Sequence, residues 1–340
     1  MKLVLRIFFM STIATVIFAG MEPGQSSFES KAWFRYNMEM QNEEIQSSGF
    51  QLARGYLVFK HQFSGRISSK FNIDIYSSDK SSDAAGAGLK IKAAYLQYSE
   101  IFPEANLMAG VIKNYFGTVY DWDYTTVQKA LEDAEKVTSS ADAGIAIVGY
   151  IPGGWGEYQA GIYNGEGYKN YGDNIDDHPV YLANVRFIPV VGLTVGGSIR
   201  YGIYDDPSDT TGDPDTYNHS EIAGVGRYSY GPFNIWAEYL MANYDEQTAG
   251  GFMIMPCVDI KKKFQIVGRY DMWDPDFEID DDGHNRFIAG VNYFITKDVK
   301  GNPQTQIQLN WERIQYELED SEPLDNISCQ FRWEFKSNPF

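Results

Sequence analysis

The sequence predicts an all-β protein, a 16-stranded antiparallel transmembrane β-barrel whose helix-bearing third extracellular loop folds inward. Three observations lead to this prediction. Most of the chain alternates apolar and polar residues with the period of two that is typical of strands. The links between these stretches alternate between short turns and mostly longer polar segments, as in outer-membrane barrels. Beyond residue 20, no apolar run is long enough for a membrane-spanning helix.

The N-terminal segment has the pattern of a secretory signal peptide. Lys2 and Arg6 supply positive charge, and the run from Ile7 to Phe18 is apolar. We therefore assign residues 1–19 to a signal peptide, with cleavage after residue 19 or 20, and residues 20–340 to a single barrel domain. A membrane anchor is the alternative interpretation, but the apolar run is short for a membrane span.

Composition excludes several classes of protein. The formal charge of −18 disfavours binding to nucleic acid, which attracts basic proteins. The chain has only two cysteines, Cys257 and Cys329, which lie far apart, and we expect both to be unpaired. Aromatic residues make up 15% of the chain, a content that suits a barrel with aromatic residues at the membrane interfaces. No pattern in the sequence calls for a cofactor or a metal ion.

After the first predicted strand, we expect a loop to about Ser48. In all, sixteen stretches have the pattern of strands. They are Trp33–Met40, Gln51–Gln62, Arg66–Tyr76, Lys92–Tyr98, Leu107–Lys113, Gly144–Ile151, Gly156–Asn164, Val180–Ile188, Leu193–Tyr204, Glu221–Tyr230, Phe233–Asp245, Phe252–Val258, Phe264–Trp273, Arg286–Thr296, Gln304–Tyr316 and Ile327–Phe335. In Leu193–Tyr204, for example, Ile199 lies on an apolar face and Arg200 on a polar face. A barrel of sixteen strands is too wide for side chains to fill, so the apolar face must point to lipid and the polar face to water.

One segment, residues 114–142, does not follow the strand pattern. Its apolar residues recur at helical spacing, and Thr125 with Gln128 resembles a capping box at a helix start. The apolar positions are Val127, Ala130, Leu131, Ala134 and Val137. Counting strands makes this segment the third external link. We therefore expect a constriction loop inside the barrel, with its apolar helix face packed on the inner wall.

Charged residues suggest how such a channel would treat ions. The predicted pore-lining residues are all basic and lie on the polar faces of the strands: Arg54, Lys60, Lys70, Lys113, Arg186, Arg200, Arg227, Arg269, Arg286 and Arg332. The constriction loop contributes Asp121, Asp123, Lys129, Glu132, Asp133 and Lys136, and all of these except Lys129 are expected to border the water path. One interpretation is an electropositive path for anions. The other is a mixed wall in which arginines pair with acids of the lumen, and the acidic loop argues against strong anion selectivity.

Several short motifs carry a family resemblance. Gly161–Gly167 ends a strand in an Asn-Gly-x-Gly pattern, Arg186 precedes a Pro and Gly-Leu hairpin, and Phe331–Phe335 is a terminal aromatic strand. Together with Gly268–Asp271, they resemble the phosphate-selective porin O and P family. The resemblance implies a trimeric sixteen-stranded porin with a narrowing third loop, and a last strand read by the barrel-assembly machinery. The segment Lys113–Phe116 departs from the family because it lacks a proline.

The expected function is an outer-membrane porin that allows passive diffusion of small hydrophilic solutes, with anions such as phosphate as candidates. Expected partners are outer-membrane lipid, lipopolysaccharide, solutes or ions, the assembly machinery and two further copies of the chain. The acidic loops 205–215 and 274–282 either bind divalent cations or are simply solvated. Alternatives are a closed structural or adhesin-type barrel and, less favoured, a hydrolase using His219 and Ser220 beside Asp215.

Overall fold

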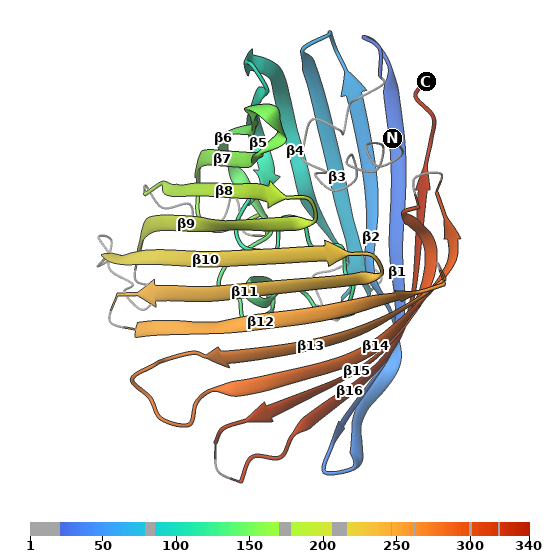
Figure 1. Cartoon of the computed structure of the whole chain (residues 1–340), viewed down its shortest axis with the longest axis vertical. Coiled ribbons are helices and arrows are strands. Elements are labelled where there is room, and N and C mark those ends of the chain that lie inside the picture. The colour runs from blue at the N-terminus through green and yellow to red at the C-terminus, as the bar shows by residue number, and fades with distance from the viewer. Residues whose placement is uncertain are drawn as a thin grey trace.

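The computed structural model describes residues 21–78, 86–169, 178–205, 216–245, 247–261, 263–298, 301–318 and 320–340. Within these residues, sixteen strands form one closed antiparallel barrel (Figure 1), which confirms the predicted fold class. The predicted signal peptide, residues 1–19, lies outside the described residues, as do residues 206–215 of the first acidic loop.

Neighbouring strands in the barrel are also neighbours in the sequence. They are β1 (Ser26–Gln41), β2 (Glu44–Gln62), β3 (Ile67–Ser77), β4 (Ala87–Phe102), β5 (Ala105–Lys113), β6 (Ala141–Ile151), β7 (Gly156–Tyr163), β8 (Val180–Val190), β9 (Leu193–Asp205), β10 (Thr216–Tyr230), β11 (Phe233–Tyr244), β12 (Gln247–Ile260), β13 (Phe264–Asp274), β14 (His284–Lys297), β15 (Pro303–Tyr316) and β16 (Leu324–Lys336). A short 3-10 turn, η3 (Pro152–Gly154), joins β6 to β7.

The barrel closes between the first and last strands. β1 pairs with β16 in a register that sets Phe34 opposite Phe331, and it pairs with β2 on its other side. The two described ends also meet, because Ser26 and Phe340 exchange backbone hydrogen bonds of 2.8 and 2.9 Å. Closure leaves no strand edge with unpaired backbone groups, which is what a strand protein needs in order to cross lipid.

The first external link differs from the prediction. The expected loop to Ser48 is wrong, because β2 begins at Glu44 and pairs with β1 along this whole stretch. Only Asn42 and Glu43 form the turn, and both have positive φ, 55° and 62°. Such a two-residue turn matches the twist of the flanking strands, so the hairpin extends further than its polar composition suggests. The predicted free state of Cys257 and Cys329 is confirmed.

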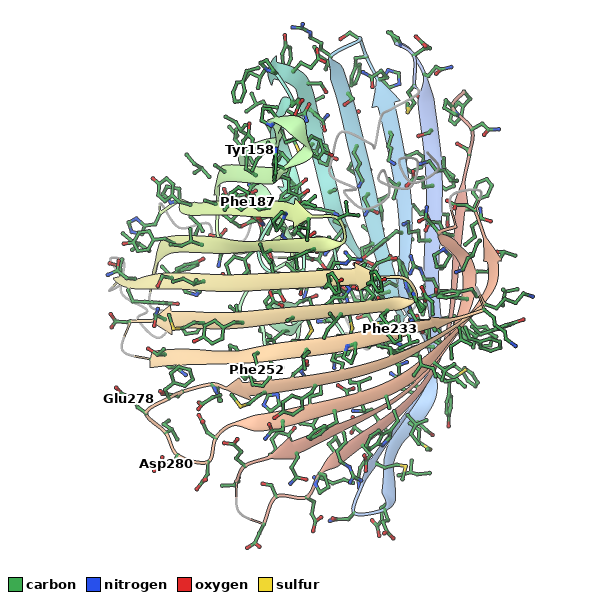
Figure 2. All side chains as sticks on the ribbon, viewed as in Figure 1. Tyr158, Phe187, Phe233, Phe252, Glu278 and Asp280 are labelled. Atoms are coloured by element: carbon green, nitrogen blue, oxygen red, sulfur yellow. The ribbon has the colours of Figure 1, made fainter. Side chains whose placement is uncertain are left out.

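Burial on the two faces of the sheet is the reverse of that in a soluble protein. On β9, Ile199 is 50% exposed, whereas the adjacent Arg200 is only 6% exposed. On β15, Leu309 is 54% exposed and Gln308 is fully buried. Figure 2 shows the aromatic side chains of Phe187 and Phe233 on the outside of the wall. The apolar face therefore points outward all along these strands, and the polar face lines the interior.

This distribution identifies the environment of the molecule. A closed barrel with an apolar outer face satisfies its backbone internally and presents hydrocarbon to lipid. The protein is thus a transmembrane β-barrel. None of the helices in the described ranges is long and apolar enough to cross a membrane.

Candidate functional site

The link between β5 and β6, residues 114–140, lies inside the barrel. Its backbone is held by inward-facing side chains from strands on widely separated parts of the wall. Arg35 on β1 donates to the Val127 carbonyl at 3.4 Å, and Arg269 on β13 donates to the Lys129 carbonyl at 2.5 Å. Asn310 on β15 accepts from the Val127 N–H at 2.7 Å. The loop therefore crosses the lumen and is bonded to the wall on the far side.

The predicted long helix in this loop is wrong. Helical structure is limited to one turn, α1 (Leu131–Ala134), and the expected capping box does not form. The wall supplies the missing bonds: Asn292 donates to the Thr125 carbonyl at 2.9 Å, and Gln308 donates to the Tyr124 carbonyl at 2.9 Å. Because side chains of the wall satisfy these backbone groups, the segment does not need a helix to do so.

The apolar residues of the loop pack against the inner wall of the barrel, as expected. Phe116 and Leu131 are fully buried and belong to one apolar cluster with Leu240 on β11 and Met253 on β12. This cluster fixes the loop against the β11–β12 part of the wall. Burial of two large side chains of this kind contributes about 1.5–3 kcal/mol each.

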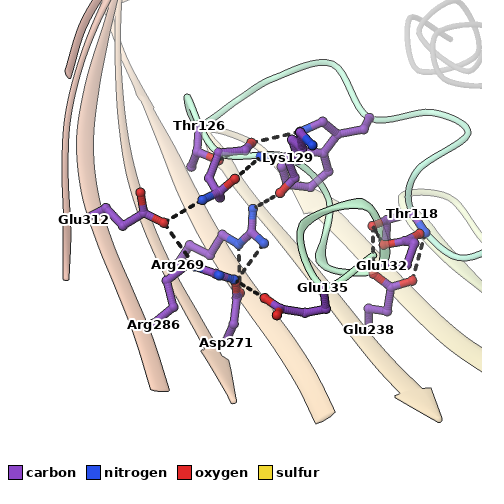
Figure 3. Close-up of polar contacts among 12 residues, drawn as sticks. Thr118, Thr126, Lys129, Glu132, Glu135, Glu238, Arg269, Asp271, Arg286 and Glu312 are labelled. Atoms are coloured by element: carbon purple, nitrogen blue, oxygen red, sulfur yellow. Dashed lines mark hydrogen bonds and ion pairs between the residues drawn. The ribbon is translucent and has the colours of Figure 1, made fainter. Parts of the chain in front are cut away.

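The densest polar contacts between loop and wall centre on Arg286 of β14 (Figure 3). Its guanidinium lies 2.8 Å from Glu135 of the loop, 3.0 Å from Asp271 of β13 and 3.0 Å from Glu312 of β15. Arg269 binds both oxygens of Asp271 at 2.7 Å. Burial acts to raise the pKa of Glu135, but bonds from His284 and Arg286 hold that pKa below its ordinary value. One arginine thus joins the loop to three strands.

The other predicted arginines on β8–β16 are also paired with acids. Asp121 of the loop lies 3.4 Å from Arg186 on β8 and 3.8 Å from Arg227 on β10. Asp123 lies 2.8 Å from Arg332 on β16. Arg200 on β9 pairs with Glu221 on β10. On this part of the wall, the mixed-charge interpretation describes the structure well, and the arginines hold the loop.

The basic residues on β2–β5 are arranged differently. Lys60 is the exception, since it pairs with Glu29 at 2.6 Å. Arg54 donates to the Tyr56 hydroxyl at 2.8 Å, and Lys113 donates to the Tyr120 carbonyl at 2.9 Å. Across the described ranges of the chain, neither these two residues nor Lys70 forms an ion pair with a carboxylate. On this side, Arg54 and Lys113 are therefore bonded to uncharged groups.

A cavity of about 180 Å³ lies beside one of these residues, Arg54. Arg54, Asp74, Lys90, Tyr168 and Lys169 are among the residues that line it. Two β-bulges lie in strands near the cavity. A β-bulge is a local irregularity that turns side chains out of the regular alternation. One lies in β2 near Arg54, where Trp33 and Phe34 pair with residues 54 and 52. The other lies in β4 at position 92, which the pairing with β3 skips.

Aromatic rings lie against Arg54 and Lys90 of this cavity and against the nearby Lys92. Lys92 lies 3.8 Å from the centre of the Tyr168 ring, and Lys90 lies 4.6 Å from that of Tyr76. Arg54 lies 5.2 Å from the centre of the Tyr124 ring. A ring face attracts a cation without carrying a net charge. The positive charge is thus held in place but not neutralised. Burial lowers the pKa of Lys169, which lies in the β7–β8 link.

Sequence reasoning missed Lys90, Lys92 and Lys169. The sequence pattern places Lys90 in a polar loop and Lys92 at the start of a strand, whereas β4 begins at Ala87. The bulge at Lys92 breaks the alternation, so period-two patterning could not place its side chain. Lys169 lies in a link whose path only the folded chain shows. The pair of lysines separated by one residue was the single usable signal.

The charged residues of the constriction loop have different surroundings. Lys129 and Asp133 form an ion pair of 3.4 Å at i,i+4 spacing, and Lys136 is exposed. Asp121 and Asp123 face arginines of the wall, as described above. The expectation that Glu132 borders water is wrong, because its side chain is fully buried. It binds the Val119 N–H at 2.6 Å and so shapes the loop from within.

The proposed hydrolase grouping does not assemble in the residues that can be examined. Asp215 lies outside the described residues. His219 points inward and lies 3.0 Å from Glu221. Ser220, the next residue along the strand, points to the opposite face, where it accepts from Asn243 at 3.2 Å. A nucleophile and its base must lie within hydrogen-bond reach, and these two side chains diverge.

The acidic loop between β13 and β14 shows no metal site in its described part. Asp276 accepts a bond from the Glu278 N–H at 3.1 Å, so these side chains shape turns. Glu278 and Asp280 project from the loop into solvent (Figure 2). Over the residues that the structure describes, no group of three or more His, Cys, Asp or Glu side chains could hold a metal ion.

Comparison with known proteins places the fold. No model of a known protein family matches the chain, and no curated protein matches it. Among solved structures, the outer membrane channel DcaP of Acinetobacter baumannii has a TM-score of 0.68 at 11% identity, over 93% of this chain and 100% of that one. OmpT of Vibrio cholerae lacking loop L8, an outer membrane protein, has a TM-score of 0.66 at 12% identity, over 91% and 99%.

An anion-selective porin from Comamonas acidovorans is similar to the same degree, with a TM-score of 0.64 at 11% identity over 91% of this chain and 99% of that chain. At such low identities, the likeness concerns the fold. The chain thus has the fold of the sixteen-stranded outer-membrane porins. The finer resemblance to the phosphate-selective O and P family remains a prediction.

Proposed function

We propose that this protein is a porin, a water-filled channel for passive diffusion of small hydrophilic solutes, and that small anions such as phosphate are favoured. The observation that carries the proposal is the asymmetry of the interior. Arginines on β8, β10, β14 and β16 are paired with acids of the loop, whereas Arg54 and Lys90 beside the cavity form no ion pair within the described residues. The solute path then runs between loop 114–140 and the β2–β5 wall.

The charge on this path sets the proposed preference. Uncompensated cations in a narrow lumen lower the barrier for anions and raise it for cations. The effect is strong where walls of low dielectric constant focus the field. Among the described residues that line the cavity, Asp74 is the one acid, beside Arg54, Lys90 and Lys169. Its presence limits the preference to a moderate one.

Ion current across a planar bilayer tests the proposal. Reconstituted protein is expected to give stable conductance, and its reversal potential in a salt gradient is expected to indicate anion preference. Lys90→Gln, at a residue that lines the cavity, should shift that potential toward cations. Lys263→Gln removes the same charge from an exposed short turn between β12 and β13, and should leave the potential unchanged. Absence of current would refute the channel and favour the closed structural or adhesin-type barrel. Equal shifts in both variants would refute the proposed path.

The assembly and partners of the protein belong to the same proposal. A structure of Vibrio cholerae OmpT in trimer form has a TM-score of 0.62 at 11% identity, over 91% of this chain and 99% of that one. By analogy, we propose a homotrimer in contact with lipopolysaccharide, inserted by the barrel-assembly machinery through β16. We also propose that it has no enzymatic activity. Mass measurement in detergent tests the trimer, and a monomer at all concentrations would refute it.

A further inference from the structure

Two buried carboxyl groups meet where the loop contacts β11 (Figure 3). Glu238 of β11 accepts from the Thr118 N–H at 2.9 Å and from the Thr118 hydroxyl at 2.8 Å. Glu132 of α1 accepts from the Val119 N–H at 2.6 Å and lies 3.4 Å from the same Thr118 hydroxyl. Thr118 of the loop therefore lies between the two carboxyl groups and contacts both.

The backbone between these carboxyls is built to let them approach. Gly117 has a φ of +49°, which favours glycine. A Cβ atom at this position would collide with a carboxylate oxygen of both Glu132 and Glu238. The two oxygens consequently lie within a few ångströms of one another. Thr118 has one hydroxyl proton, so it can donate to only one of them at a time.

The strands around the pair offer it no counter-charge of its own. Opposite Glu238 lie Val225 on β10 and Met253 on β12, and both are apolar. On β9, Ser198 accepts from the Gly117 N–H at 3.1 Å. Glu132 is 0% exposed and Glu238 is 3% exposed, so water does not screen them.

Two arginines face this region, and both are already engaged. Arg186 on β8 donates to the Gly117 carbonyl and lies 3.4 Å from Asp121. Arg227 on β10 lies 3.8 Å from the same Asp121. The carboxyl pair therefore has a hydroxyl and two N–H groups as partners but no ion pair within the described residues.

Two adjacent carboxylates in a dry site cannot both be ionised without a large electrostatic penalty. A single proton shared between them removes the repulsion and supplies the missing donor. We propose that Glu132, Glu238 and Thr118 form a proton-dependent latch, which holds loop 114–140 against β11 while the pair keeps a proton and releases it when that proton is lost. The effect on current rests on the proposed channel function, but the shared proton does not.

The sign of the pH dependence follows from the geometry. Burial raises the pKa of Glu132, so the protonated pair persists above the ordinary range of a glutamate. The latch is therefore closed below the raised pKa of the pair and opens as the pH rises through it. Loss of the proton then frees a segment of the loop that is otherwise bonded to the wall.

Infrared spectroscopy tests the shared proton without any measurement of current. The folded barrel at neutral pH should show the stretching band of a buried protonated carboxyl, and Glu238→Gln or Glu132→Gln should abolish it. Glu44→Gln, a change at an exposed position of the first hairpin, should leave the band intact. A spectrum without this band, or a band that survives both variants, would overturn the latch.

Single-channel recording tests its consequence. Wild-type channels should be quiet at neutral pH, and fluctuations of the current should rise as the pH becomes alkaline. Glu238→Gln keeps a neutral group in the same volume, so this alkaline rise should be lost. An identical pH profile in both proteins would overturn the latch. A complete lack of current would refute the channel and leave the infrared result to decide on the latch.

Discussion

At the scale of single residues, the interior of this barrel is governed by how each charge is satisfied. Arg286 contacts Glu135, Asp271 and Glu312, while Lys90 lies 4.6 Å from the centre of the Tyr76 ring. The first arrangement neutralises an arginine and anchors the loop. The second leaves a cavity-lining lysine without an ion pair to a carboxylate of the described residues. Residues of one chemical class thus have two roles, and their neighbours determine which role each has.

Replacing Arg286 should loosen the loop and weaken the barrel. Arg286→Ala leaves three acids without their cation, and breaking a buried pair of this kind costs about 3–5 kcal/mol. We expect a lower thermal unfolding temperature and noisier current. Arg66→Ala breaks the exposed pair with Glu100, which is 3.9 Å long, and should change stability by less than about 1 kcal/mol. Equal losses in the two variants would contradict the anchoring role of Arg286.

At the scale of elements, two of the acidic residues that attach the irregular loop to the wall have opposite dependence on pH. Glu135 is ionised and bound by Arg286, whereas Glu132 shares its site with Glu238. An ionised contact is lost in acid, and a protonated contact is lost in alkali. The loop is consequently held most firmly at intermediate pH.

The acidic limit of this range is testable through Glu135. Its pKa is depressed in the folded state, so its contribution to stability is full above the unfolded pKa of roughly 4.3 and declines as the pH falls through the lower folded value. Current noise in the wild type should rise in acid. Glu135→Gln should already be noisy at neutral pH and change little on acidification. A variant that stays quiet at neutral pH and becomes noisy in acid would show that Glu135 is not the group responsible.

At the scale of the whole molecule, the reversal of inside and outside defines the protein. Apolar side chains cover the outer face, and the polar core consists of the loop and the inner wall. Lipid hydrocarbon takes the place of a protein core, and the closed strand order satisfies the backbone.

An arginine introduced on the outer face should destabilise the barrel according to its depth. Leu309→Arg places a charge on the lipid-facing side of β15 and should cost about 2–4 kcal/mol if it lies near the membrane midplane. Ile45→Arg, at the exposed tip of the first hairpin, should cost about 0–1 kcal/mol. Urea unfolding from lipid vesicles measures both values. A cost for Ile45→Arg as large as that for Leu309→Arg would mean that the membrane also covers the hairpin.

The strand pattern was readable from the sequence because lipid and water impose a strict period of two on each strand. The number of strands, the outward apolar face and the position of the third external link all follow from that pattern, and the structure bears them out for the strands and faces. Local rules failed where tertiary contacts replace local ones. The helix expected after Thr125 is limited to Leu131–Ala134. Asn292, Gln308 and Asn310 instead form hydrogen bonds with backbone groups of the loop.

The sequence alone therefore determined that the chain is a barrel with a polar interior, since periodicity is a property of each strand by itself. Only the tertiary structure decided which cations are neutralised. Arg186 and Asp121 are 65 positions apart, and Thr118 and Glu238 are 120 positions apart. Such distant pairs form because the loop crosses the lumen, and no local pattern encodes that crossing. The bulge at Lys92 sets that side chain against the Tyr168 ring for the same reason, because the register with β3 decides where it points.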